Sequence, residues 1–286
     1  FKMRQADSHR RVLTVVMDGV GLSSSDFGNA VANASMPNLD WLRKNATWTT
    51  LNAHGKAVGL PSDSDIGNSE VGHNALGAGR IFDQGAKLVQ NAIASGSIFS
   101  GETWNQMLKQ VVSKQTTLHF LGLLSDGNVH SHEDHLYAMM RRAKQDGAKK
   151  VRIHVLFDGR DVGEKSAETY VARLEKVMQE LRSPSFDVAV ASGGGRMHIT
   201  MDRYQADWPM VKRGWDCHVQ GLAPFSFKSL PEAVAKFRED PSITDQYIPA
   251  FVITDQGKPA GLIKDGDAVV FFNFRGDRAI EISKAF

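Results

Sequence analysis

Two segments of this chain place residues of the kind that act in covalent chemistry on phosphate. At positions 67–73 the sequence reads GNSEVGH, which puts Ser69 in a glycine-flanked turn, and upstream Asp18 stands where an apolar run of strand length ends. A serine hydroxyl is a weak nucleophile at neutral pH unless a base or a metal ion activates it. A carboxylate at a strand end is an oxygen ligand of the type that hard divalent cations prefer. The pair suggests a metal-activated nucleophile; the alternative is that Ser69 only caps a helix and Asp18 only opens a turn.

Five arginines stand in or just after glycine-containing loops: Arg160, Arg196, Arg203, Arg275 and Arg278. Arginine binds phosphate and carboxylate through paired hydrogen bonds and keeps its charge when it is desolvated. A small, doubly anionic substrate needs such a cluster, whereas an arginine taken alone is more often part of a surface salt bridge. Asp161, next to Arg160, is suited to orient an arginine or to act as a general base.

The sequence HSHEDH at positions 130–135 places three histidines close together after a predicted strand. It matches the H-x-H-x-D-H pattern of zinc hydrolases of the metallo-β-lactamase type, and such histidines can ligate Zn²⁺. That fold needs further ligands on later strand ends, where His154 and His198 are poorly placed to serve. His132 and His135 equally fit the first turn of a helix. Zinc hydrolysis therefore stays a minor alternative.

Apolar runs of strand length alternate with helical patterns along the chain. The runs predict strands at 12–17, 117–124, 151–157, 187–191, 250–253 and 268–274. Apolar periodicity predicts helices at 37–45, 103–114, 133–146, 166–181, 203–214, 230–239 and from 278 onward. This alternation predicts an α/β fold with a mostly parallel sheet flanked by helices on both faces. Five of the strands run into polar or glycine clusters, and such ends gather at the sheet edge where ligands bind.

Composition limits the compartment and the partners. The chain of 286 residues has 34 basic and 32 acidic residues and a net charge of +2, which favours neither nucleic acid nor an anionic membrane as a partner. The single cysteine, Cys217, excludes an intramolecular disulfide and fits a reducing compartment, so we expect a cytoplasmic protein. The chain starts at Phe1 and stops at Phe286 inside a helical pattern, and we expect it to be part of a longer protein.

Six motifs occur in order along essentially the whole chain: MDGVG at 17–21, GNSEVGH at 67–73, LSDGNVHSH at 124–132, FDGRD at 157–161, GR at 195–196 with MDR at 201–203, and FNFRGDR at 272–278. Together they closely resemble the cofactor-independent (2,3-bisphosphoglycerate-independent) phosphoglycerate mutases of the alkaline phosphatase superfamily. The resemblance implies two α/β domains, of which a transferase domain is inserted into an alkaline-phosphatase-like domain. Residues 1–83 then resemble the N-terminal part of the phosphatase domain, which binds metal, and residues 84–286 resemble the substrate-binding transferase domain, truncated at 286.

The resemblance also implies an activity and residue roles. The family are isomerases that interconvert 3-phosphoglycerate and 2-phosphoglycerate in glycolysis and gluconeogenesis through a phosphoserine, with two divalent metal ions. By resemblance Ser69 is the nucleophile and, with Asp18, a metal ligand, while Asp161 handles the proton of the glycerate hydroxyl. The substrate contacts implied are His130, Arg160, Asp161, Arg196, Arg203, Arg275 and Arg278. The expected metal is Mn²⁺, with Mg²⁺ or Co²⁺ as alternatives, and the expected state is a monomer.

Two departures from the family pattern affect these expectations. The interval from Arg196 to Arg203 is seven positions, where the family usually has six, so the role of Arg203 is in question. The remaining metal ligands of the family lie in its C-terminal half, so we expect them beyond Phe286 and expect this chain alone to be inactive. A related metal-dependent phosphohydrolase or phosphopentomutase, and a non-catalytic anion-binding module, stay open as alternatives.

Overall fold

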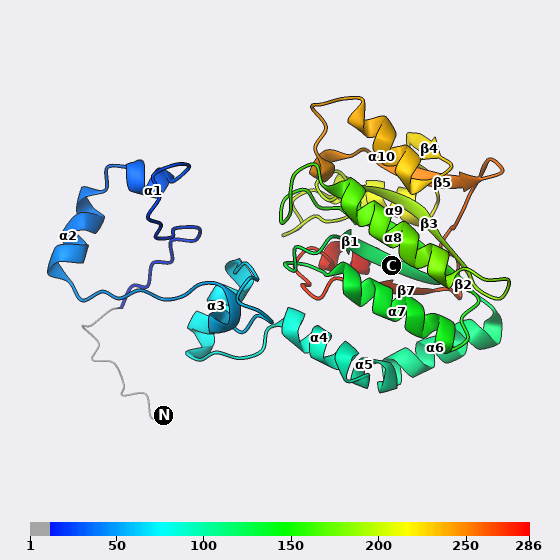
Figure 1. The fold of residues 1–286 in the computed structure, drawn as a ribbon, viewed down its shortest axis with the longest axis horizontal. Coiled ribbons are helices and arrows are strands. Elements are labelled where there is room, and N and C mark those ends of the chain that lie inside the picture. Colours follow the sequence, from blue (N-terminus) through cyan, green and yellow to red (C-terminus); the bar gives the residue numbers. More distant parts are fainter. Residues whose placement is uncertain (1–11) are drawn as a thin grey trace.

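The computed structural model of the chain describes residues 12–286 (Figure 1). These residues build a seven-stranded sheet in the order β4-β5-β3-β2-β1-β7, with the short β6 paired to β5. The strands are β1 (Leu118–Leu124), β2 (Lys150–Phe157), β3 (Asp187–Gly195), β4 (Phe225–Phe227), β5 (Phe251–Asp255), β6 (Lys258–Pro259) and β7 (Ala268–Phe271). Five of the six predicted strands are therefore confirmed, and so is the α/β fold class.

Most of the sheet is parallel, as predicted. β1 pairs in parallel with β2 and with β7, so that Leu118 lies beside Val151 on one side and Ala268 on the other. β2 pairs in parallel with β3, while β5 runs antiparallel to β3 and parallel to β4. The carboxyl ends of β1, β2, β3 and β7 therefore meet at one edge, and the polar clusters predicted from the sequence lie in the loops that follow them.

The helical elements, in chain order, are α1 (Ala30–Asn33), α2 (Pro37–Asn45), η1 (Gly55–Val58), α3 (Ser69–Ala78), α4 (Gly85–Ala94), α5 (Ser97–Ser100), α6 (Glu102–Lys114), α7 (Glu133–Gln145), α8 (Ala167–Leu181), α9 (Trp208–His218), α10 (Leu230–Arg238), η2 (Asp245–Tyr247) and α11 (Ile280–Ala285). None of the helices within residues 12–286 combines the length and the apolarity needed to cross a bilayer.

Helices cover both faces of the sheet. Alternate residues of β1 point to two separate cores, with Phe120 in the larger one and Leu121 in the smaller one. On the first face α6, α7, α8 and α10 pack against the larger core, for example through Trp104 and Leu174. On the second face α9 and α11 contribute to the smaller core, for example through Val211. Burial of this apolar surface, at roughly 25 cal/mol per Å², holds the strand ends in fixed positions.

The predicted strand at residues 12–17 is wrong for this chain. The segment is irregular, and the side chains of Val12 and Val15 are 92% and 71% exposed. A strand is stable only beside a partner, and no strand precedes β1 within residues 12–286. In Figure 1 the neighbouring helices α1 and α2 extend away from the sheet.

The helix predicted at residues 203–214 is also displaced, because α9 begins at Trp208. Asp207 caps it by accepting a hydrogen bond from the N–H of Met210, and Pro209 occupies the first turn, where proline is well tolerated. The spacing of apolar residues, on which the prediction rested, does not report the capping residue and the proline that set the start of the helix. It also missed α1, α3, α4, α5 and the short strands β4 and β6.

Candidate active site

Ser69 is the first residue of α3, and its hydroxyl contacts Asp18. Ser69 Oγ donates a hydrogen bond of 2.7 Å to Asp18 Oδ2, so two predicted residues 51 positions apart meet in space. The helix cap is Asn68, whose side-chain oxygen accepts from the N–H groups of Glu70 and Val71. Because Asn68 provides the cap, the Ser69 hydroxyl is not needed for that role and bonds to Asp18 instead.

The surroundings of Ser69 suit an anion and a cation together. A phosphate on Ser69 would lie at the N-terminus of the ten-residue helix α3, where the helix dipole favours negative charge. The oxygen atoms of Asp18 and Ser69 are of the type that a hard divalent cation binds. No group of three or more His, Cys, Asp or Glu side chains able to hold a metal occurs in the part of the chain that the structure describes. The described residues therefore fit part of a metal site through these two oxygen donors.

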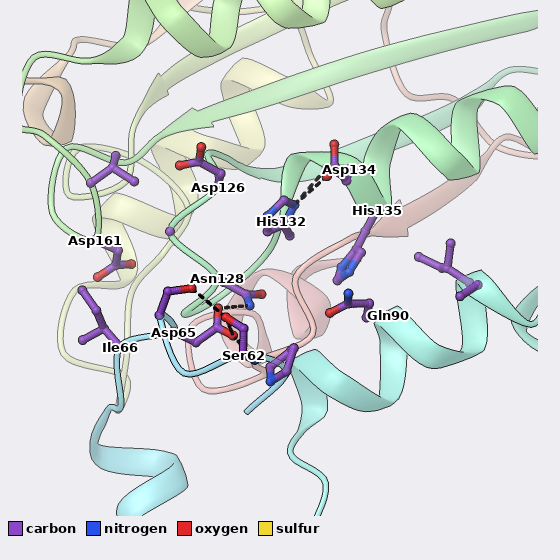
Figure 2. Close-up of a pocket in the computed structure, with 16 residues that line it drawn as sticks. Ser62, Asp65, Ile66, Gln90, Asp126, Asn128, His132, Asp134, His135 and Asp161 are labelled. Carbon is purple, nitrogen blue, oxygen red and sulfur yellow. Dashed lines mark hydrogen bonds and ion pairs between the residues drawn. The ribbon is translucent and has the colours of Figure 1, made fainter. Parts of the chain in front are cut away.

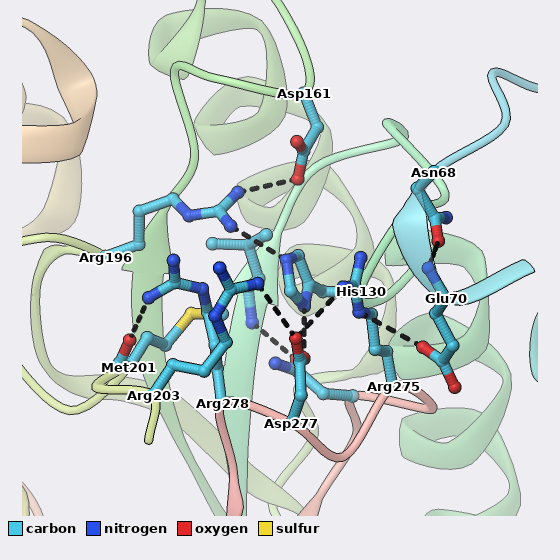
Figure 3. Close-up of polar contacts among 12 residues, drawn as sticks. Asn68, Glu70, His130, Asp161, Arg196, Met201, Arg203, Arg275, Asp277 and Arg278 are labelled. Carbon is cyan, nitrogen blue, oxygen red and sulfur yellow. Dashed lines mark hydrogen bonds and ion pairs between the residues drawn. The ribbon is translucent and has the colours of Figure 1, made fainter. Parts of the chain in front are cut away.

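Arg196, which follows β3, is almost completely buried, with 1% of its surface exposed. Its Nη1 atom donates to Asp158 at 2.8 Å. Nη1 also donates to Asp161 at 2.6 Å, and Nη2 donates to His130 Nε2 at 2.8 Å (Figure 3). The loops after β1, β2 and β3 thus converge on one guanidinium. Asp158, which also accepts from Ser125 Oγ at 2.6 Å, was missed by the sequence interpretation.

His130 is buried and neutral. Burial, followed by the positive charges of Arg196, Arg275 and other arginines, lowers its pKa to about 2. Because Nε2 accepts from Arg196, the ring proton lies on Nδ1. His130 Nδ1 faces Asp277 Oδ1 at 3.7 Å, and neither buried atom makes a hydrogen bond within residues 12–286. A donor and an acceptor are therefore available to a ligand at this point.

Asp277 contacts two further arginines of the site. Its Oδ2 atom lies 3.0 Å from Arg275 Nη2 and 3.4 Å from Arg203 Nη1 (Figure 3). Arg278 donates from Nη1 to the carbonyl oxygen of Met201 at 2.7 Å. Burial and the neighbouring arginines lower the pKa of Arg278. The structure thus brings Arg203 into the cluster in spite of the longer interval that separates it from Arg196.

The two residues of the loop after β2 have different surroundings. Asp161 is partly buried, and its pKa is raised by burial and by the charge of Asp158, against the opposing effect of Arg196. A raised pKa suits a general base, which works best when its pKa is near the working pH. Arg160 is exposed, and its side chain makes no hydrogen bond or ion pair among the described residues. The structure therefore joins Asp161 to the cluster and leaves Arg160 at the surface.

Glu70 connects the serine to the arginines. Its Oε2 atom lies 3.1 Å from Arg275 Nε, and it directly follows Ser69 (Figure 3). Burial raises the pKa of Glu70, while Arg275 acts in the opposite direction. The sequence interpretation missed Glu70 and Asp277 as site residues. Both could have been predicted from the arginines, because several partly buried arginines require carboxylate partners nearby.

A cleft of about 630 Å³ lies beside the cluster, between residues 61–66 and the loops after β1 and β2 (Figure 2). Asn128 Nδ2 donates to Asp65 Oδ1 at 2.7 Å and closes one side. The wall also holds Asp126, Asp134 and Asp161, which gives it an acidic character. Such a wall repels an anion, so the arginine cluster is the better site for an anionic substrate.

The histidines of residues 130–135 do not share one environment. His130 lies among arginines, which repel a cation. His132 caps α7 by accepting from the N–H of Asp134 at 3.2 Å, as the helix interpretation predicted. His135 packs against Phe274, and burial lowers its pKa to about 4. This arrangement does not support the zinc hydrolase alternative.

The fold and the site together define an α/β protein with an arginine cluster suited to a small anion at the carboxyl edge of a parallel sheet. Residues 89–286 match the family model described as the BPG-independent PGAM N-terminus. The chain therefore belongs to the family of 2,3-bisphosphoglycerate-independent phosphoglycerate mutases, which confirms the resemblance found in the motifs.

The relatives cover nearly all of this chain. A probable 2,3-bisphosphoglycerate-independent phosphoglycerate mutase of Leptospira interrogans is 56% identical over 280 residues, which is 97% of this chain and 51% of the relative. The mutase of Ricinus communis is 52% identical over 279 residues, 96% of this chain and 50% of the relative. Leishmania mexicana phosphoglycerate mutase, solved at low cobalt concentration, superposes with a TM-score of 0.91 at 51% identity, covering 95% of this chain and 50% of that one. The chain spans about half the length of the relatives that it matches.

Proposed function

We propose that the full-length protein interconverts 3-phosphoglycerate and 2-phosphoglycerate without 2,3-bisphosphoglycerate, through a phosphoserine at Ser69. The observation that carries the proposal is the hydrogen bond from Ser69 to Asp18 together with the contact of the adjacent Glu70 with Arg275. A phosphohydrolase needs the activated serine but no site that retains the alcohol product. The arginine cluster with the neutral His130 provides such a site, which favours a mutase over a phosphohydrolase or a phosphopentomutase.

In the first transfer, Ser69 Oγ attacks the phosphorus atom of bound phosphoglycerate. The bond from phosphorus to Ser69 Oγ forms while the bond from phosphorus to the glycerate oxygen breaks, and the glycerate oxygen takes up the proton that Asp161, whose pKa is raised, carries at the start of the step. Asp18, which accepts the Ser69 hydrogen in the structure, is placed to take the serine proton. Two divalent ions, Mn²⁺ in the first place, would be held in part by Asp18 and Ser69 and would neutralise charge on the phosphoryl group.

In the second transfer, the glycerate stays bound and presents its other hydroxyl to the phosphoserine. The arginines around Asp277 hold its carboxylate, since guanidinium groups bind carboxylates in paired geometry. Asp161, ionised by the first transfer, takes the proton of the attacking hydroxyl, and Asp18 returns its proton to Ser69 Oγ as phosphorus leaves. Water must stay out during this exchange, because it would hydrolyse the phosphoserine.

The organisation of the whole protein belongs to the same proposal. Residues 1–83 form part of a metal-binding domain, and residues 84–286 form the transferase domain. This chain alone binds phosphoglycerate without turnover, because the described residues supply two oxygen donors toward the metal site. We place the protein in the cytoplasm as a monomer. Its single thiol, Cys217, fits that compartment: burial raises the pKa of the thiol to about 12, so this cysteine is unreactive.

The test is phosphoglycerate mutase turnover coupled to enolase, with Mn²⁺ and without 2,3-bisphosphoglycerate. It compares the full-length protein, this chain, and Ser69→Ala in each. Turnover in the full-length protein that disappears in Ser69→Ala supports the proposal. An inactive full-length protein, or a Ser69→Ala variant at full rate, would overturn it.

A further inference from the structure

A chain of hydrogen-bonded side chains crosses the sheet and ends next to the arginine cluster. We name it the buried relay; its members are, in order, Asp267, His119, His154, Ser192, His218 and Thr200. From Asp267 onward the successive donor–acceptor distances are 3.3, 2.9, 2.7, 2.7 and 2.9 Å. The three histidines, the serine and the threonine are each at most 1% exposed. So many buried polar groups are costly unless every one is paired, and here they are paired with one another.

The hydrogens in the buried relay have one consistent direction. Burial lowers the pKa of all three histidines, so each ring is neutral, with one donor nitrogen and one acceptor nitrogen. An ionised carboxylate only accepts, so Asp267 takes a hydrogen from His119 Nε2, which leaves His119 Nδ1 as the acceptor for His154 Nε2–H. The same logic makes Ser192 donate to His154 and accept from His218 Nδ1–H.

Thr200 is therefore the last donor, since only His218 Nε2 remains as an acceptor. Its backbone has φ +70°, a left-handed conformation that is unfavourable for a β-branched residue. Its N–H donates to the carbonyl of Met210 at 3.1 Å, and the close approach of Gly214 leaves no room for a side chain there. The backbone at this point must be held in place by such contacts.

The backbone at Thr200 is connected to the arginine cluster through the next residue. The next carbonyl, that of Met201, accepts the 2.7 Å hydrogen bond from Arg278 Nη1, and Arg203 follows two residues later (Figure 3). A change of conformation at Thr200 would move the Met201 carbonyl and release Arg278.

We propose that Thr200 and His218 are positioning residues for the mutase reaction, and that the buried relay fixes the backbone at Thr200 so that Met201 orients Arg278 toward the phosphoglycerate. The expected effect of Thr200 and His218 on phosphoglycerate binding rests on the proposed function. The buried relay itself is a statement about hydrogen positions, and it is tested without turnover.

The first experiment determines the histidine tautomers by long-range ¹H–¹⁵N correlation on the histidine-labelled full-length protein. We expect Nε2–H on His119 and His154, and Nδ1–H on His218. Asp267→Ala removes the carboxylate that accepts from His119 Nε2–H, so His119 loses the group that fixes its tautomer and we expect its Nε2–H fraction to fall. Asp265→Asn, an exposed neighbour, leaves it unchanged. His218 with Nε2–H in the parent protein, or His119 with Nδ1–H, overturns the buried relay.

The second experiment tests positioning in the full-length protein by steady-state kinetics. Thr200→Val removes the hydroxyl but keeps the shape, and we expect KM for phosphoglycerate to rise about tenfold, which corresponds to the loss of one hydrogen bond. We expect kcat to change less than KM, because Arg278 holds the substrate and does not react. Thr200→Ser restores the hydroxyl and should bring KM back to within about twofold of the parent value.

Thr254→Val is the matched control, because within residues 12–286 the Thr254 hydroxyl bonds only to the carbonyl of Phe227, and it should leave KM unchanged. A parent-like KM in Thr200→Val, or a Thr200→Ser variant as impaired as Thr200→Val, overturns the positioning role. If the parent protein has no turnover, the proposed function fails while the tautomer measurement still decides on the buried relay.

Discussion

Ser69 Oγ and Asp18 Oδ2 lie 2.7 Å apart, although 51 residues separate them along the chain. The contact places an alcohol against a carboxylate at the N-terminus of α3, with Asp18 exposed and Ser69 partly exposed. The neighbouring Glu70 reaches Arg275, so the contact stands beside the arginine cluster. We propose that this contact is the geometric basis for a serine that receives a phosphoryl group from a substrate held by arginines.

Asp18→Asn in the full-length protein should lower kcat on the order of 100-fold or more, because the amide is a weaker acceptor and a weaker metal ligand. Stability should change little, since Asp18 is exposed. Asp26→Asn, another exposed aspartate of the same segment, serves as the control and should retain the parent rate. A kcat for Asp18→Asn within threefold of the parent value would speak against a role for this carboxylate.

Arg196→Met should destabilise the fold by about 3–5 kcal/mol, because it leaves the buried carboxylate of Asp158 without its charged partner. Arg160→Met removes an exposed arginine from the adjacent loop and should stay within about 0.5 kcal/mol of the parent. Urea unfolding at pH 7 measures both. Equal stability of the two variants would show that the Arg196 contacts contribute nothing to folding.

The buried histidines predict a loss of stability in acid. The pKa values of His119 and His218 in the fold are about 4 and about 3, below the usual 6.5, and that of His154 is also lowered. Because the unfolded chain binds these protons first, stability is complete above pH 6.5 and falls as the pH decreases through 4 toward 3. Between pH 6.5 and 5, His119 and His218 should each lower the free energy of unfolding by about 2 kcal/mol. Urea midpoints against pH should show a shallower slope in His218→Gln; identical slopes would contradict this account.

Two helical glycines should respond oppositely to alanine. A Cβ on Gly214 would lie 2.2 Å from Thr200 Oγ1 and 3.0 Å from Thr200 Cα, so Gly214→Ala should destabilise by about 1–3 kcal/mol. Among the described residues, nothing beyond the backbone of α3 itself lies within 4 Å of a Cβ added at Gly77, so Gly77→Ala should stabilise by about 0.5–1 kcal/mol. Thermal unfolding of the two variants checks this, and a neutral Gly214→Ala would mean that the Thr200 backbone is not tightly held.

The sheet could be predicted because its strands are buried on both faces and read as continuous apolar runs, as in β1 and β2. The convergence of His130, Asp161 and Arg196 could be predicted as well, since parallel strands deliver their following loops to one edge. These predictions use only local patterns and a general rule of topology.

Other features depend on three-dimensional partners that the sequence does not display. Residues 12–17 have the composition of a strand, but pairing requires a neighbour, and none is present within residues 12–286. The start of α9 is set by the Asp207 cap, and the periodicity of apolar residues carries no information about caps. The roles of Glu70 and Asp277 emerge only when the arginines are seen to crowd together.

The most direct measurement is the phosphorylation state of Ser69 during turnover. The full-length protein is mixed with 3-phosphoglycerate and Mn²⁺, quenched in acid within one turnover, and its peptides are analysed by mass spectrometry. We expect one phosphate on the peptide that contains Ser69, which appears before 2-phosphoglycerate and is absent in Ser69→Ala. Formation of 2-phosphoglycerate with Ser69 unmodified throughout would contradict it.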